Sequence, residues 1–254
     1  MNRNPKILAV AGKGGVGKTS LSAAFVRLLT ETHPDARILA IDADPAVGLS
    51  TALGVEVRQT LDDIRKQIVS SVEDGEPREA IELLSEARYR IFDTMVEQQK
   101  FSFLAIGRPE TAGCYCKVNA YLKEVIHLLS DSFDYVVIDG EAGIEQINRR
   151  VMEKVTHLVL VTDPSRKGTQ VIDTIRKVAD DLVMYEKCGA VVNRVVHPEL
   201  IPYLQVEGTE ILTFIASDSA QAANDIQGRS VFDLPPDAPI LTGALEALQK
   251  LEIL

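Results

Sequence analysis

A glycine-rich segment near the N-terminus joins an apolar run to a helical pattern. The apolar run is Lys6–Ala11, and the segment Gly12-Lys13-Gly14-Gly15-Val16-Gly17-Lys18-Thr19 follows it directly. Apolar residues then recur at i, i+3, i+4, i+7 and i+8, which is the spacing of a helix with one buried face. A strand, a glycine loop and a helix in this order begin a βαβ unit and predict a parallel sheet. The apolar residues of the helical pattern are Leu21, Ala24, Phe25, Leu28 and Leu29.

The rest of the chain repeats this alternation of apolar runs and helical patterns. Several runs are continuously apolar, such as Tyr135-Val136-Val137-Ile138, and strands buried on both faces of a parallel sheet have this composition. The predicted fold class is therefore α/β, with a doubly wound and mostly parallel sheet. The six further predicted strands are Arg37–Ile41, Phe101–Ile106, Asp134–Asp139, His157–Thr162, Cys188–Asn193 and Ile211–Ile215, and a final helix is expected near Pro239–Leu251.

The stretch Gly54–Lys100 differs from the rest because it is dense in charged residues. Gly75 and Pro77 interrupt it in the middle. We expect helices that pack over one end of the sheet, within a single domain that covers residues 1–254. The helical pattern of the stretch passes through Ile81, Leu84, Ile91 and Met95.

The glycine-rich segment matches the P-loop pattern G-x-x-x-x-G-K-[ST] in full, between a strand and a helix. Glycines let backbone N–H groups turn inward around phosphate oxygens, and the helix that follows directs the positive end of its dipole at the same place. Lys18 is expected to reach the β- and γ-phosphates of ATP, while the Thr19 hydroxyl binds Mg²⁺. The alternative, a glycine-rich turn without a ligand, is disfavoured by the complete motif. The predicted ATP- and ADP-binding residues of this region are Gly12, Lys13, Gly14, Gly15, Val16, Gly17, Lys18, Thr19 and Ser20.

Composition limits the partners of the chain. Lys and Arg together number 27 against 37 for Asp and Glu, which gives a net charge of −10. Proteins that coat nucleic acid or bind anionic lipid need a basic surface, so we expect neither partner. No apolar run is long enough to span a bilayer, and Ile7–Ala11 is too short for the core of a signal peptide. Three cysteines are too few for a disulfide scaffold, and we expect a cytoplasmic protein with reduced thiols.

Lys13 occupies the second position of the P-loop motif. With this lysine the loop resembles the deviant Walker A loop of the MinD/ParA/nitrogenase-iron-protein class of P-loop ATPases. The resemblance implies that Lys13 reaches across a homodimer to the phosphates of the partner's nucleotide. The alternative is an ordinary solvated loop lysine.

Two later segments resemble the other motifs of the same class. Ile41-Asp42-Ala43-Asp44-Pro45 resembles its switch I segment, which implies that Asp44 orients or deprotonates the attacking water and that Asp42 belongs to the nucleotide site. The segment from Val136 to Gly143 resembles the Walker B and switch II segments. It implies that Asp139 holds Mg²⁺ through water and that the Gly143 backbone contacts the γ-phosphate. The predicted catalytic residues are Lys13, Lys18, Asp44 and Asp139.

Asn193 and Arg194 end a late predicted strand and resemble the adenine-binding position of the class. A side-chain amide can donate to an adenine edge and accept from it, which suits this role. The alternative for Asn193 is a loop residue that caps a turn.

Cys114 and Cys116 lie one residue apart, just before a predicted helix. A disulfide between them would close a strained ring, whereas thiols near a helix N-terminus ionise readily and bind metal. Two thiolates do not complete a tetrahedral site, so a two-fold dimer in which each chain supplies both cysteines is the simplest solution. Two unremarkable loop cysteines are the alternative. Cys188 lies in an apolar strand pattern and is predicted to be an inert core residue.

The P-loop, the cysteine pair and the stretch Asp139-Gly140-Glu141-Ala142-Gly143-Ile144-Glu145 together resemble the CooC-type ATPases. These are accessory ATPases for nickel insertion into carbon monoxide dehydrogenase and acetyl-CoA synthase. The resemblance implies a homodimer that binds Ni²⁺ or Zn²⁺ through Cys114 and Cys116 of both chains. It further implies that ATP hydrolysis is coupled to delivery of the metal to one of these enzymes as the client.

Two other readings of the same motifs remain open. A reductase resembling the nitrogenase iron protein would use two cysteines per chain to hold a [4Fe–4S] cluster, although that family takes them from separated positions. A MinD-like positioning ATPase would need a basic amphipathic C-terminal helix, whereas the segment 245–254 carries two acids and one lysine. A ParA-like one would need basic DNA-binding patches. A small-molecule kinase is disfavoured because Lys13 and the Asp42–Asp44 segment have no role in it.

Overall fold

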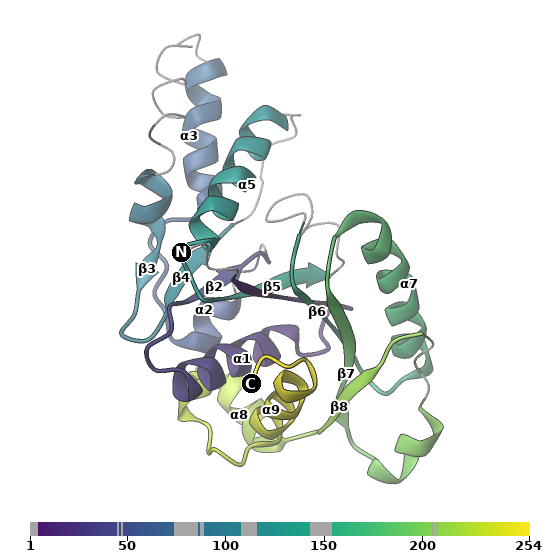
Figure 1. The fold of residues 1–254 in the computed structure, drawn as a ribbon. Coiled ribbons are helices and arrows are strands. Elements are labelled where there is room, and N and C mark those ends of the chain that lie inside the picture. Colours follow the sequence, from purple (N-terminus) through teal and green to yellow (C-terminus); the bar gives the residue numbers. More distant parts are fainter. Residues whose placement is uncertain are drawn as a thin grey trace.

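The computed structural model describes residues 5–44, 46, 48–73, 86, 89–107, 116–142, 154–204, 206 and 208–254. These residues form one eight-stranded sheet in the order β3-β4-β2-β5-β1-β6-β7-β8, which Figure 1 shows at the centre of the molecule. All neighbouring strands are parallel except β3 and β4. The strands are β1 (Lys6–Gly12), β2 (Ile38–Asp42), β3 (Val96–Glu97), β4 (Ser102–Ala105), β5 (Tyr135–Ala142), β6 (His157–Thr162), β7 (Lys187–Val195) and β8 (Ile211–Ala216).

Helices cover both faces of this sheet. One face carries α1, α2, α9 and the short η2, and the other carries α3, α5 and α7. The doubly wound, mostly parallel α/β fold predicted from the sequence is thereby confirmed, with all seven predicted strands in place. The helices are α1 (Lys18–Thr32), α2 (Gly48–Leu53), α3 (Leu61–Glu73), α5 (Cys116–Ser130), α7 (Arg166–Leu182), η1 (Pro198–Tyr203), α8 (Ser219–Ile226), η2 (Val231–Asp233) and α9 (Pro239–Lys250).

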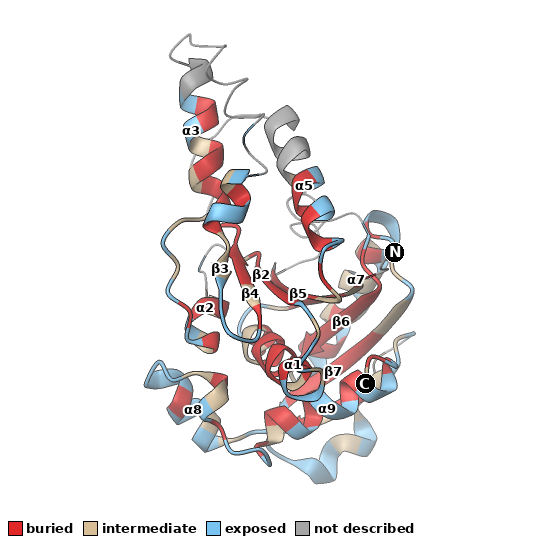
Figure 2. Cartoon of the chain, turned by 60° about the vertical axis from the view of Figure 1, so that its left-hand side comes forward, coloured by how far each residue is buried: buried red, intermediate tan, exposed pale blue. Residues whose placement is uncertain are grey.

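The central strands are buried on both faces, as their continuous apolar runs predict. Along β1, Leu8 and Val10 face the core under α1, whereas Ile7 and Ala9 face the core under α7. Figure 2 shows this as red ribbon throughout the middle of the sheet. Because helices cover each face, the strands need apolar side chains at every position and not at alternate ones.

Helix α1 buries the apolar residues that the sequence spacing predicts. Leu21, Phe25 and Leu29 are fully buried, and Leu28 is partly buried against the same core. The helix packs against α9, whose own apolar residues belong to that core. This packing fixes the helix that begins at the glycine loop.

The charge-rich region 54–100 contains a strand that the sequence analysis did not predict. Helix α3 and the helical residues 89–94 fit the expectation of helices near the sheet, but β3 then pairs antiparallel with β4 at the sheet edge. Two residues are too few to produce a recognisable strand pattern. Ile81 and Leu84 of the predicted helical pattern lie outside the described residues.

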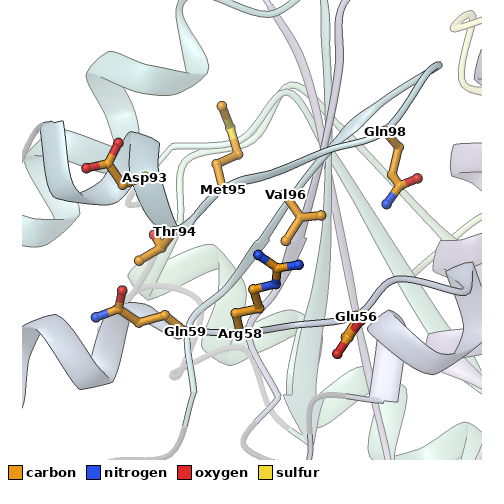
Figure 3. A pocket seen from close by; sticks show the side chains of 8 residues that line it. All are labelled: Glu56, Arg58, Gln59, Asp93, Thr94, Met95, Val96 and Gln98. Atoms are coloured by element: carbon orange, nitrogen blue, oxygen red, sulfur yellow. The ribbon is translucent and has the colours of Figure 1, made fainter.

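The segment between α2 and α3 crosses the sheet edge from one helical layer to the other. Val55 packs in the core under α1, and Leu61 packs in the core on the opposite face. A pocket of about 510 Å³ lies between this segment and β3, as Figure 3 shows. The pocket is lined by Glu56, Arg58, Gln59, Asp93, Thr94, Met95, Val96 and Gln98.

Within the residues that the structure describes, no helix is long and apolar enough to cross a membrane.

Candidate active site

Three of the predicted site residues, Gly12, Asp42 and Asn193, lie at or near the carboxyl ends of parallel strands. β1 ends at Gly12, β2 ends at Asp42, and β7 carries Asn193 near its end. Because β1, β2, β5, β6 and β7 are parallel, these ends lie along one edge of the sheet. This edge is where doubly wound folds bind their ligands.

Glycine is required at two positions of the loop, because a Cβ atom at either position would lie too close to neighbouring atoms. A Cβ on Gly12 would lie 2.2 Å from the carbonyl oxygen of Val161 on the neighbouring strand, and one on Gly17 would lie 2.3 Å from Nδ2 of Asn193. Gly17 also has a φ of 95°, in the left-handed region that favours glycine. The loop therefore needs glycine at both positions in order to turn tightly from β1 into α1.

The two loop lysines make different contacts. Lys18 is buried, and its Nζ donates to the carbonyl oxygen of Lys13 at 3.2 Å, so this ammonium group lies across the loop. Lys13 is partly exposed, and its Nζ lies 3.7 Å from a carboxylate oxygen of Asp163 after β6. Partial burial would raise the pKa of Asp163, but hydrogen bonds from Ser165 and the Lys13 charge outweigh it and hold this pKa below its ordinary value.

Asp42 and Asp139 are the two fully buried carboxyl groups of the site. They lie opposite each other on neighbouring strands β2 and β5. Burial, with the adjacent Asp139 carboxylate, raises the pKa of Asp42 to about 7, against backbone N–H donation from Leu49 and Asp44. Burial likewise raises the pKa of Asp139 to about 6. Two carboxyl groups in this position cannot both ionise cheaply without a cation.

Asp139 has the chemistry that a magnesium site requires. Its Oδ1 accepts a hydrogen bond from the Ser22 hydroxyl at 3.0 Å, whereas its Oδ2 is buried and has no hydrogen-bond partner within the described residues. The Thr19 and Ser22 hydroxyl groups and the Lys18 charge oppose the effect of burial on the pKa of Asp139. Mg²⁺ prefers oxygen ligands of this kind, so the residues present fit the ion.

Asp44 lies between the buried pair and solvent. Its backbone N–H donates to Oδ1 of Asp42 at 3.1 Å, and its own Oδ1 accepts from the Ala46 N–H at 2.9 Å. Asp42 also accepts from the Leu49 N–H in the first turn of α2. The backbone N–H groups of Asp44 and Leu49 therefore both donate to the Asp42 carboxyl group, and the catalytic role of Asp44 stays a prediction.

Asn193 is buried against the loop. Its Nδ2 donates to the carbonyl oxygen of Val16 at 2.9 Å, and its Oδ1 accepts from the backbone N–H of Arg194. Arg194 has a φ of 61°, which is uncommon for a residue with a side chain. The structure thus places Asn193 in contact with the P-loop, and adenine binding by Asn193 and Arg194 stays a prediction.

Several predicted site residues lie outside the described residues. Gly143 and Cys114 belong to this group, and Cys116 is the first residue of α5 but its side chain is not described. Cys188 lies in β7, half-buried against the core, where burial raises the pKa of its thiol to about 12 and favours the protonated form. Among the described residues, no group of three or more His, Cys, Asp and Glu could hold a metal ion.

Ser22 and Asp163 are site residues that the sequence analysis missed. Ser22 lies among the apolar residues of α1, and a buried hydroxyl group of this kind needs a hydrogen-bond partner. Asp163 directly follows β6, at the same sheet edge as the P-loop. Both positions could have been suspected from the sequence, but their partners depend on neighbouring strands.

The comparisons with known proteins agree with this geometry. A family model described as the CobQ/CobB/MinD/ParA nucleotide binding domain matches residues 7–231. The chain belongs to this family. As a member of the CobQ/CobB/MinD/ParA family it is an ATP-binding P-loop NTPase, consistent with ATPase activity.

Individual members of the family resemble the chain over most of its length. The uncharacterized ATP-binding protein MJ0685 of Methanocaldococcus jannaschii is 34% identical over 249 residues, which cover 96% of this chain and 98% of that protein. The carbon monoxide dehydrogenase accessory protein CooC of Rhodospirillum rubrum is 31% identical over 240 residues, or 90% of each chain. The septum site-determining protein MinD of Pyrococcus horikoshii, solved with Mg-ADP, has a TM-score of 0.69 at 20% identity. The alignment with that structure covers 98% of this chain and 96% of the MinD chain, and the two proteins share the fold.

The buried carboxyl pair predicts how stability depends on pH. Because folding raises the Asp42 pKa from 3.8 to about 7, the folded state holds more protons than the unfolded state between these values. The free energy of unfolding should therefore decrease as pH rises from 5 to 8, by on the order of a few kcal/mol. Asp42→Asn should flatten this slope, measured by urea unfolding of the nucleotide-free protein in EDTA.

The exposed carboxylate of Asp35 provides the control for this experiment. Asp35→Asn should keep the slope of the unmodified protein. Equal slopes for Asp42→Asn and the unmodified protein would show that Asp42 is ionised at neutral pH.

Proposed function

We propose that this protein is a dimeric maturation ATPase that binds Ni²⁺ or Zn²⁺ and couples ATP hydrolysis to nickel insertion. Its client would be carbon monoxide dehydrogenase or acetyl-CoA synthase, and the protein would act in the cytoplasm. The observation that carries the proposal is the cysteine pair, Cys114 and Cys116, in a chain whose P-loop has the additional Lys13. The similarity to the CooC accessory protein over 90% of each chain supports the choice of client.

The position of the cysteine pair favours metal binding. Helix α5 begins at Cys116, and Cys114 precedes this helix start by two positions in the sequence. The positive end of the helix dipole lowers thiol pKa values at such positions, and thiolates are the form that binds metal. Four thiolates from two chains would complete one site.

The contact of Lys13 fits a residue that changes partners. Its ion pair with Asp163 is partly exposed and 3.7 Å long, and such surface pairs contribute only about 0–1 kcal/mol. A phosphate group of the partner's nucleotide offers a more highly charged acceptor. ATP binding could therefore draw Lys13 from Asp163 to the second chain at little cost.

In the proposed hydrolysis of ATP, the residues at this edge of the sheet have separate roles. Lys18 and the loop N–H groups hold the phosphates, and Asp44 orients the attacking water or accepts its proton. Mg²⁺, when bound, neutralises phosphate charge, and Asp139 and Thr19 are the residues that would hold it. In the proposed nucleotide site, Asn193 and Arg194 would contact the base. The Gly143 backbone would contact the γ-phosphate.

Lys18→Ala and Asp44→Ala should separate binding from hydrolysis. Lys18→Ala should lose nucleotide affinity because the phosphates lose their buried cation. Asp44→Ala should retain ATP but hydrolyse it 10²–10⁴-fold more slowly. This decrease corresponds to an activation free energy that is higher by about 3–5 kcal/mol. Steady-state phosphate release and equilibrium binding of fluorescent ATP measure the two effects. Hydrolysis by Asp44→Ala at the unmodified rate would refute its assignment.

Lys13→Ala should leave nucleotide binding by one chain nearly intact, because Lys18 and the loop backbone remain. It should lower the dimer fraction that a non-hydrolysable ATP analogue induces, since the charge contact between chains is lost. Multi-angle light scattering measures this fraction. Lys167→Ala removes an exposed lysine of α7 and should behave like the unmodified protein. Equal dimer fractions for both variants would make Lys13 an ordinary surface lysine.

Metal titration tests the proposed function directly. Binding should saturate near one Ni²⁺ or Zn²⁺ for two chains, because four thiolates form one site. Cys114→Ser or Cys116→Ser should abolish tight binding while nucleotide binding survives. Thiolate-to-metal absorbance and oligomeric mass are followed together, using reduced protein.

Cys188→Ser is the matched control, because that thiol is held protonated within β7 and should not bind metal. One metal per chain at full affinity would contradict the shared site. Four irons with labile sulfide for two chains would favour the iron-protein-like reductase. No metal binding at all, with a normal ATPase, would favour a MinD- or ParA-like positioning function.

A further inference from the structure

The hydroxyl group of Ser22 connects α1 to the buried carboxylate of β5. Ser22 has no exposed surface, and its Oγ donates to Oδ1 of Asp139 at 3.0 Å. It lies one turn along the helix from Thr19. The helix that carries the P-loop lysine and threonine is thus joined by a side chain to Asp139.

Two other buried hydroxyl groups in the described helices, those of Thr30 and Ser130, do not act in this way. Thr30, on the same helix, donates to the backbone carbonyl of Arg27, and Ser130 of α5 donates to that of Ile126. A helical serine can always satisfy its hydroxyl on the preceding turn. Ser22 instead donates to a side chain of the active site. Satisfying the serine hydroxyl does not require this partner, because a carbonyl of the preceding turn would serve as well.

The hydrogen bond determines which oxygen of Asp139 remains available. A carboxylate rotates easily about its last torsion, and its two oxygens exchange places unless one is held. Ser22 holds Oδ1 at 3.0 Å and the Thr19 hydroxyl also acts on this carboxylate, while Oδ2 stays buried and without a hydrogen-bond partner among the described residues. An unpaired buried carboxylate oxygen is costly, and a metal ion with its bound water would satisfy it.

We propose that Ser22 is a positioning residue for the magnesium site. By holding Oδ1 of Asp139, Ser22 leaves Oδ2 as the oxygen that would face the ion of the nucleotide complex. The inference rests on the nucleotide site of the proposed function and is independent of any nickel or zinc cargo. Partners that orient the groups around a metal typically change its affinity 10–100-fold when they are removed. Ser22 should therefore act on magnesium affinity more than on nucleotide affinity.

Three variants test this inference through magnesium dependence. Ser22→Ala removes the donor, Ser22→Thr retains it with one additional methyl group, and Ser130→Ala removes a buried helical hydroxyl remote from Asp139. The readout is the Mg²⁺ concentration that half-saturates the increase in affinity for fluorescent ADP, together with the ADP affinity in EDTA.

We expect Ser22→Ala to raise the half-saturating Mg²⁺ concentration 10–100-fold, with the ADP affinity in EDTA unchanged. Ser22→Thr should stay within about threefold of the unmodified protein, and so should Ser130→Ala. An unchanged Mg²⁺ dependence in Ser22→Ala would overturn the inference, as would an equal shift in Ser130→Ala.

Ser22→Cys provides a second test should Ser22→Ala fail to fold, because the thiol fills the same space and is a weak donor. Its half-saturating Mg²⁺ concentration should rise clearly above that of Ser22→Thr, and an unchanged value would overturn the inference. An unmodified protein that binds no nucleotide would instead refute the nucleotide site itself. The two failures are therefore distinguishable.

Discussion

The burial of two carboxyl groups on neighbouring strands is the constraint on which the site depends. Asp42, at the end of β2, and Asp139, within β5, lie opposite each other with no exposed surface. Donors from separate elements hold them: the N–H groups of Asp44 and Leu49, and the hydroxyl of Ser22. The start of α2 and the first turns of α1 thus both donate hydrogen bonds to these carboxyl groups. A cation beside the phosphate loop would stabilise the ionised pair.

The fold was predictable because its information is local. Each central strand is covered on both faces, so its residues are apolar without alternation, and the runs in β1 and β5 mark them directly. The edge strand β3 carried no such signal, since two residues beside a crossing segment need no apolar pattern. Secondary structure that depends on pairing at an edge is therefore harder to predict than strands of the core.

The site was predictable in its residues and less so in its contacts. The glycine spacing defines the loop before α1, and the requirement for Gly12 and Gly17 follows from close contacts to β6 and β7. The bonds of Asn193 to the loop and of Ser22 to Asp139 join residues more than 100 positions apart, so no local pattern contains them. Sequence spacing identifies which groups do the chemistry, whereas their orientation depends on the packed sheet.

The central claim of the proposed function is that nucleotide and metal stabilise the same dimer. The most direct measurement is the affinity for Ni²⁺ or Zn²⁺ in metal-buffered solution, with and without a saturating non-hydrolysable ATP analogue. If one dimer binds both, the analogue should raise metal affinity roughly 5–150-fold, and the metal should raise analogue affinity by the same factor. A metal affinity that is identical in the two conditions would contradict the claim.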